Sequence, residues 1–241
     1  MSMNESAALA LGVAGRTVLI AGATSESGHA CAAALKEAGA NVIAVGSNAE
    51  RLAALAEAVP GVITRVCDLS DYDAVARLAE EIRTTALKHG HGGIDGLVHL
   101  VGGWRGGGGL AGQSDDDWRV LEAAFGTLRN TTRAFNEQLL ASDAGRLAIV
   151  SSSSVARPLA GGANYAAAKA AADAWTRAVA QGFAKAGAAS PNAEPSAAAV
   201  IFVVKSLAGL EQKLASSVVA LWQSSAAELN ASHIELAPDE S

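Results

Sequence analysis

Short apolar runs alternate along the chain with longer segments whose apolar residues recur at helical spacing. The apolar runs predict buried strands at residues 16–21, 41–45, 62–67, 94–101, 147–150 and 197–204, and a last short strand at 233–236. The segments between them predict helices at 29–38, 48–58, 71–88, 118–140, 164–186 and 207–225. Strands that alternate with helices through short connections predict a single-domain α/β fold, a doubly wound parallel sheet with helices on both faces.

The composition limits the class of protein. Half of the 241 residues are apolar and 17% are charged, which is typical of a globular chain that buries a core. A net charge of −6 without a basic stripe predicts no nucleic-acid partner. Cys31 and Cys67 form no CxxC pair and the five histidines lack zinc-ligand spacing, so we expect no metal site.

The start of the chain differs from the rest. Residues 1–14 predict a flexible arm in front of one domain at 15–241. This arm carries an acidic residue where a signal peptide has basic ones, and no apolar run in the chain reaches the length of a membrane span. We therefore expect a cytoplasmic protein without a membrane partner.

The segment 145–172 contains the residues with the clearest chemistry. Tyr165 and Lys169 are four residues apart in a predicted helix and therefore lie on one face of it. A serine run at 151–154 ends the preceding strand at the same edge of the sheet. A nearby ammonium favours an ionised phenol, which predicts a lowered pKa for Tyr165. Such a phenol can exchange a proton with a carbonyl or alcohol oxygen that a serine hydroxyl binds.

The spacing in this segment resembles the short-chain dehydrogenase/reductase family. Ser152 stands thirteen residues before Tyr165, as the family's catalytic serine does, and Gly145-Arg146 opens the strand at the family's position. Ser154 matches the local wording better and is the alternative to Ser152.

The resemblance extends over about residues 14–236 and implies a Rossmann-type sheet and an NAD(P)(H)-dependent oxidoreductase. In that family, hydride passes between a nicotinamide and a carbonyl or secondary alcohol of a small substrate. The resemblance assigns general acid–base catalysis to Tyr165 and carbonyl polarisation to Ser152. It assigns to Lys169 the lowering of the tyrosine pKa and a hydrogen bond to the nicotinamide ribose, so that Tyr165 and Lys169 are also cofactor-binding.

The resemblance also implies a set of positions that bind the nucleotide. They are Gly22, Thr24, Ser25 and Gly28 in the first turn, Ser47 and Asn48 after the second strand, Asp68 and Leu69 after the third, and Val101 and Gly102 after the fourth. The glycines let pyrophosphate approach the backbone at a helix N-terminus, and Asp68 corresponds to a residue that reaches the adenine amino group. Because no acidic residue follows the second strand, while Ser47, Asn48 and Arg51 can hold a 2′-phosphate, we expect NADP(H) rather than NAD(H).

Three positions depart from the family pattern. Glu26 replaces the middle glycine of the first turn, His99 replaces an asparagine after the fourth strand, and Phe125 replaces the catalytic asparagine of the long helix. We expect His99 to be a packed core residue. These departures support a second hypothesis, a non-catalytic member that senses dinucleotides or binds a partner. A hydrolase is disfavoured because the chain contains no Gly-x-Ser-x-Gly elbow.

Two further expectations concern surfaces. The glycine-rich stretch at 102–112 predicts either a mobile flap that brings Trp104 and Arg105 over the site or a disordered loop. The resemblance implies that the helices at 118–140 and 164–186 pair with those of other copies, and the small residues from Ala166 to Ala172 permit close contact. We therefore expect a homodimer or homotetramer. The identity of the small carbonyl or alcohol substrate has no recognisable signal in the sequence.

Overall fold

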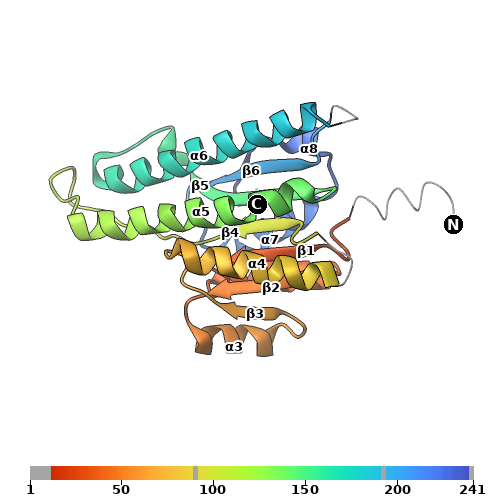
Figure 1. Cartoon of the computed structure of the whole chain (residues 1–241). Helices are drawn as coiled ribbons and strands as arrows, with labels where there is room; N and C mark the ends of the chain where they lie inside the picture. Colours follow the sequence, from red (N-terminus) through yellow and green to blue (C-terminus); the bar gives the residue numbers. More distant parts are fainter. Residues whose placement is uncertain (1–11, 89–91, 191–193, 239–241) are drawn as a thin grey trace.

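Seven parallel strands form one twisted sheet in the computed structural model, which describes residues 12–88, 92–190 and 194–238 (Figure 1). The strand order is β3-β2-β1-β4-β5-β6-β7. The strands are β1 (Thr17–Ala21), β2 (Asn41–Gly46), β3 (Ile63–Val66), β4 (Gly96–His99), β5 (Gly145–Ser152), β6 (Ala197–Val204) and β7 (His233–Leu236). The order reverses direction between β1 and β4, and ligands of such sheets bind outside the carboxyl ends of the strands at that point.

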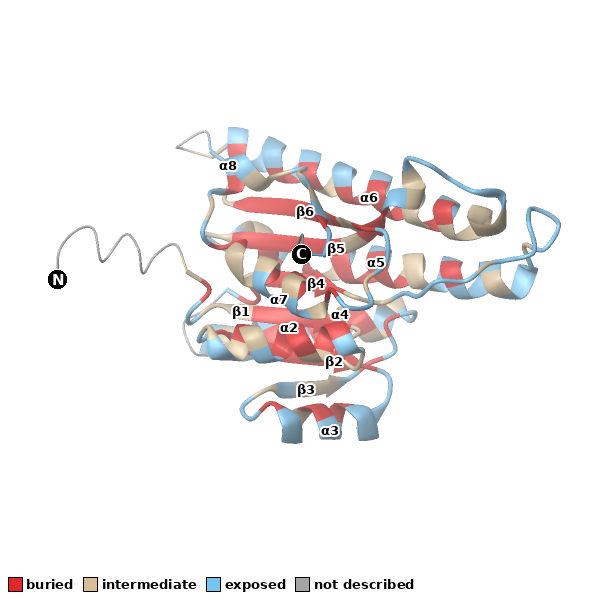
Figure 2. Cartoon of the chain, turned by 180° about the vertical axis from the view of Figure 1, so that it is seen from behind, coloured by how far each residue is buried: buried red, intermediate tan, exposed pale blue. Residues whose placement is uncertain are grey.

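Helices cover both faces of this sheet, as the sequence predicts. The α-helices are α2 (Glu26–Glu37), α3 (Ala49–Ala58), α4 (Tyr72–Lys88), α5 (Asp115–Ala141), α6 (Ala163–Ala188), α7 (Glu211–Ala220) and the short α8 (Ala226–Leu229). Helices α4, α5 and α6 lie on one face, and α2 and α7 pack together on the other (Figures 1 and 2). Successive residues of β1 point into opposite layers, Val18 toward α2 and Leu19 toward α4 and α5. This double burial explains why the strands read as continuous apolar runs.

Three predicted helices have wrong boundaries, and one of them, α5, begins at Asp115 rather than at residue 118 because the Ser114 side chain caps it. Helix α2 begins at Glu26 rather than at residue 29, because the Ser25 hydroxyl accepts a hydrogen bond from Gly28 N at 3.0 Å and caps the helix earlier. The helix predicted over 207–225 is shorter, α7 at Glu211–Ala220, and a separate helix, α8, begins at Ala226. A capping box of Ser225 and Glu228 starts the second helix.

The predicted N-terminal arm lies largely outside the described residues. Of its described part, Val13 is buried in the core between the sheet and α2. Residues 12–14 therefore pack with the domain. Among the residues described, no helix combines the length and the apolar character needed to cross a membrane.

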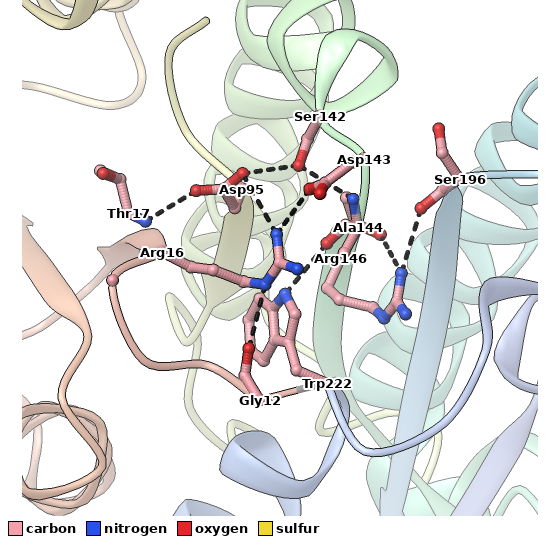
Figure 3. Close-up of polar contacts among 12 residues, drawn as sticks. Gly12, Arg16, Thr17, Asp95, Ser142, Asp143, Ala144, Arg146, Ser196 and Trp222 are labelled. Carbon is pink, nitrogen blue, oxygen red and sulfur yellow. Dashed lines mark hydrogen bonds and ion pairs between the residues drawn. The ribbon is translucent and has the colours of Figure 1, made fainter. Parts of the chain in front are cut away.

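A network of charged groups closes the edge of the sheet where the strands begin (Figure 3). Arg16 Nη1 lies 2.6 Å from Asp143 Oδ1, and Asp95 accepts hydrogen bonds from Thr17 N and Ser142 Oγ. Arg146 is buried and donates to four backbone carbonyl groups, those of Gly145, Ser196, Leu221 and Ser224. This arginine thereby joins β5 to the segments that precede β6 and follow α7.

Candidate active site

The three predicted catalytic residues meet at the carboxyl edge of the sheet. Ser152 is the last residue of β5, and helix α6 presents Tyr165 and Lys169 one turn apart. Tyr165 and Lys169 line a cavity of about 430 Å³ together with Val101 and Gly102. Ser152 and Tyr165 line an adjoining hollow of about 1110 Å³ that extends toward β7. Tyr165 therefore stands at the junction of two spaces.

Hydrogen bonds from Ser154 fix the orientation of the Ser152 hydroxyl. Its hydroxyl oxygen accepts hydrogen bonds from Ser154 N at 3.2 Å and from Ser154 Oγ at 2.9 Å. The Ser152 proton is therefore available to Tyr165 or to a substrate oxygen. Ser154, the alternative from the sequence, lies two residues beyond the end of the strand and supports Ser152 through these two hydrogen bonds.

Lys169 reaches across the top of β5. Its ammonium nitrogen donates to Val150 O at 2.7 Å and lies 5.8 Å from the centre of the Tyr165 ring. Burial of the ammonium lowers the pKa of Lys169 to about 8. The lysine is thus charged at neutral pH and is close to losing its proton under mildly alkaline conditions.

The expectation of a lowered pKa for Tyr165 is wrong for this structure. Burial raises the pKa of Tyr165 above its ordinary value, and the hydrogen bond with Ser152 acts in the opposite direction. The sequence shows that a lysine stands one turn away, but it does not show that the phenol is removed from water. Desolvation is therefore the larger influence on this phenol, and the hydrogen bond with Ser152 only partly offsets it.

The turn after β1 leaves no room for side chains at its two glycines. Gly22 has a φ of +83°, and a Cβ there would lie 2.9 Å from Val101 N. A Cβ on Gly28 would overlap the backbone of Ala23. Between them, Glu26 is exposed and points into solvent, while Ser25 lines the cavity beside Tyr165. The two glycines thus keep the turn tight and the start of α2 close to the end of β1, as glycines do in a dinucleotide-binding turn, and the exposed Glu26 does not disturb that packing.

The other predicted nucleotide-binding residues lie along the same edge, at the ends of β1, β2 and β3. Asn48 caps α3 through its side-chain oxygen, and Arg51 donates to Thr24 O at 2.5 Å. Ser47 is exposed beside them. Hydrogen bonds from the hydroxyl and the N–H of Ser70 hold the pKa of the exposed Asp68 carboxyl below its usual value.

Leu69 is buried next to this aspartate, and its carbonyl group accepts a hydrogen bond from Asn130. Asn130 is the nearest asparagine after Phe125 in α5, and it supports the loop after β3 rather than Lys169. None of Gly22, Thr24, Gly28, Ser47, Asn48, Asp68 and Leu69 lines the described cavities around Tyr165.

The glycine-rich stretch after β4 forms a rim, which the side chain of Gln113 and a backbone hydrogen bond from Gly107 N to Gly161 O join to the loop before α6. Gln113 Nε2 donates to the carbonyl groups of Gly107, Gly109 and Gly161, and its oxygen accepts from Asn164 N at 3.0 Å. Trp104 lines both spaces beside Tyr165 and is 60% exposed. Nothing in the sequence indicated Gln113, because its partners are backbone atoms brought near by the fold.

The sequence also missed polar residues of the cavity itself. Ser27 is buried in the first turn of α2, and Lys205 follows the end of β6; both line the cavity with Tyr165 and Lys169. Ser27 could have been found from its place beside Ser25 at a helix N-terminus. The connection from β6 to α7 is only six residues long, 205–210, and its first residue, Lys205, also lines the large hollow.

Comparisons with known proteins agree with this arrangement. The family model described as short chain dehydrogenase matches residues 16–210. A 3beta-hydroxysteroid dehydrogenase of Mediterraneibacter gnavus is 33% identical over 184 residues, which span 71% of this chain and 62% of that protein.

Solved structures show the same fold. An NADPH-bound short chain oxidoreductase of Pseudomonas aeruginosa PAO1 with an atypical catalytic center has a TM-score of 0.76 and 23% identity, with 94% of this chain and 96% of that chain covered. A metagenomic short-chain oxidoreductase in complex with NADP has a TM-score of 0.77 and 24% identity, with 95% and 99% covered. The match over residues 16–210, together with the sheet and the Ser152–Tyr165–Lys169 arrangement, means that this chain belongs to the short chain dehydrogenase family of oxidoreductases.

Proposed function

We propose that this protein interconverts a ketone and a secondary alcohol with a nicotinamide nucleotide. The observation that carries the proposal is the convergence of Ser152, Tyr165 and Lys169 from β5 and α6 on adjoining spaces at the carboxyl edge of the sheet. Gly22 and Gly28 keep the turn after β1 tight against the backbone, and Val101 and Gly102 line the cavity beside Tyr165. A bound nicotinamide supplies or accepts the hydride.

The protein's own residues move and hold the proton. In the reducing direction, Ser152 donates a hydrogen bond to the substrate carbonyl oxygen, and the Tyr165 phenol passes its proton to that oxygen as it becomes an alkoxide. The Lys169 ammonium stabilises the phenolate that remains. In the oxidising direction the same proton returns from the alcohol to Tyr165.

We propose NADP(H) as the preferred nucleotide because of charge at the end of β2. Arg51 lies over the turn after β1 through its bond to Thr24 O, and Ser47 is exposed beside it. A guanidinium in this position suits a 2′-phosphate. The Arg51→Ala variant should weaken NADPH binding about tenfold and leave NADH binding unchanged. Fluorescence titration with both nucleotides measures this, and an equal loss for both would contradict the assignment.

We propose bulky, mainly apolar ring ketones or alcohols as substrates. The hollow beside Tyr165 is large, and Trp104 and Leu159 present exposed apolar side chains at its rim. The similar protein from Mediterraneibacter gnavus is a 3beta-hydroxysteroid dehydrogenase. A hydroxysteroid is an apolar ring alcohol of this size class. A panel of 3-ketosteroids and smaller cyclic ketones with NADPH, followed by nicotinamide absorbance, tests the proposal. Nucleotide binding without turnover on any ketone or alcohol of the panel would favour the non-catalytic hypothesis.

The oligomeric state stays a prediction. Ala166, Ala168 and Ala172 are buried within the chain, so these residues pack internally, whereas Ala167 and Ala170 of the same helix are exposed. We propose a homodimer or homotetramer through α5 and α6. Sedimentation at micromolar concentration measures this, and a monomer would contradict it.

A further inference from the structure

Helix α5 offers Lys169 no polar side chain at the position where the family resemblance expects asparagine. Phe125 occupies that position, and its ring packs edge-on against Trp175 with ring centres 6.3 Å apart. The ammonium of Lys169 nevertheless has three N–H donors, and Val150 O receives a hydrogen bond from it. A further acceptor is therefore needed for the N–H donors of Lys169 that Val150 O does not use.

A small cavity lies on that side of Lys169. It has a volume of about 40 Å³, and Phe125, Leu121 and Leu128 of α5 form much of its wall. A water molecule needs roughly 10–15 Å³ of such volume and at least two polar partners. His99 and Lys169 are the ionisable side chains among the described residues that line it. The cavity therefore has room for a water molecule, and His99 and Lys169 provide two polar groups in its wall.

His99 is fixed at this cavity by a hydroxyl of α5. It ends β4, is 5% exposed, and its Nε2 lies 2.9 Å from Thr127 Oγ1. The Thr127 hydroxyl donates to Ala124 O at 2.7 Å. Because that hydroxyl has one proton, its oxygen accepts from Nε2–H of His99. This assigns the proton of the imidazole to Nε2 and leaves Nδ1 as an acceptor.

The imidazole is also neutral. Burial and, second, the nearby charge of Lys169 lower the pKa of His99 to about 3, and a hydrogen bond with the backbone of His99 itself acts in the opposite direction. The side chains that reach the cavity from β5, Ile149 and Val150, are apolar. Across this small cavity, Lys169 is the one charged group among the described residues. His99 also lines the larger cavity, which Tyr165 and Lys205 line as well.

We propose that His99 is a positioning residue of this active site, whose Thr127-bound imidazole accepts a hydrogen bond from a cavity water that in turn accepts one from Lys169. The inference rests on the proposed function and deepens it. In this arrangement His99 on β4 replaces the asparagine that α5 lacks. Its contribution is to stabilise the charged form of Lys169, on which the phenolate of Tyr165 depends.

The pKa of Lys169 tests this directly and requires no substrate. The chain has six lysines, so their side-chain nitrogens can be resolved by nuclear magnetic resonance and Lys169 assigned with the Lys169→Arg variant. His99→Leu removes the acceptor, so the pKa of Lys169 should fall by about one pH unit. His99→Asn keeps an acceptor and should leave it near the value of the unmodified protein. An unchanged Lys169 pKa in His99→Leu would overturn the proposal.

A double variant separates the hydrogen bond from simple burial. Adding Phe125→Asn to His99→Leu returns an amide to the cavity wall from α5, and the pKa of Lys169 should recover. Failure to recover, with both single variants folded, would attribute the shift to burial and contradict the proposal. Thr127→Val should lower the pKa of Lys169 in the same direction, while Thr131→Val, a buried threonine of the same helix that donates to Thr127 O, should not.

The imidazole tautomer provides an independent measurement. Nitrogen-15 spectra of His99, assigned by its loss in His99→Asn, should show a proton on Nε2 and no titration between about pH 5 and 9. A proton on Nδ1, or titration in this range, would overturn the proposal. NADPH binding is measured separately, so absence of binding would reject the proposed function without deciding the role of His99.

Discussion

The two edges of the sheet bury polar groups in opposite ways. At the edge where the strands begin, Arg146 donates to four carbonyl groups, and Arg16 pairs with both Asp95 and Asp143 (Figure 3). At the edge where the strands end, Ser152, Tyr165 and Lys169 face open spaces. Buried polarity alone therefore does not mark an active site. The mark is polar groups whose hydrogen-bonding capacity is left for a ligand.

The pKa directions agree with this difference. Burial lowers the pKa of Arg146 to about 10. The guanidinium therefore stays charged at neutral pH and keeps its hydrogen bonds to the four carbonyl groups. Burial lowers the pKa of Lys169 to about 8, so that this ammonium can lose its proton under mildly alkaline conditions, and raises that of Tyr165, which keeps its proton at neutral pH. The first edge stabilises the fold, and the second can change its protonation.

The largest expected effect breaks the chemistry and spares the fold. Tyr165→Phe removes only the hydroxyl that passes the proton, so kcat should fall by about 10³-fold or more, with the free energy of unfolding within about 0.5 kcal/mol of the unmodified protein. Turnover with the best ketone of the panel and urea unfolding measure the two. Tyr72→Phe is the matched control, because Tyr72 is the other tyrosine of the chain and its ring packs under Arg133. Retained turnover in Tyr165→Phe would reject the assignment.

The next largest effect lowers the stability of the fold and spares the active site. Arg146→Leu leaves four carbonyl groups without their donor in a buried site, which should lower the free energy of unfolding by about 3 kcal/mol. The distance to the other edge predicts unchanged nucleotide affinity in the folded protein. Urea unfolding and NADPH titration at a temperature where the variant is folded measure these quantities. A loss of affinity in the folded variant would contradict the division between the edges.

The smallest effect concerns the free energy of unfolding that the protein loses by burying the Lys169 ammonium. A buried ammonium is unfavourable, so Lys169→Met should raise the free energy of unfolding at pH 7 by about 2 kcal/mol while it removes turnover. The folded-state pKa of about 8 lies below that of the unfolded chain. The unmodified protein should therefore gain stability as pH rises above about 8 toward the unfolded pKa, and the difference from the variant should shrink. Urea unfolding at several pH values measures this; a constant difference would contradict the lowered pKa.

Much of this account was predictable from the sequence. The apolar runs predicted the strands, and Asn48 caps α3 as expected. The spacing around Tyr165 selected Ser152 over Ser154, and the structure places Ser152 at the end of β5 with Ser154 bonded to it. These features depend on local periodicity and on distances along a single helix or strand.

The rest depends on contacts between distant segments. Gln113 holds the glycine-rich rim through Gly161, and Arg146 reaches Leu221, in each case far along the chain. The raised pKa of Tyr165 follows from burial, which the sequence does not specify. His99 was expected to be a packed core residue; it is buried, but its bond to Thr127 and its place at the cavity appear only in the fold.

The most direct test of the central claim is a fluorescence titration of the pure protein with NADPH and NADH. The account predicts micromolar binding of NADPH, weaker binding of NADH, and the same NADPH affinity in folded Arg146→Leu. Absence of binding of either nucleotide by the folded protein would contradict the claim that the edge where the strands end is a nucleotide-dependent active site.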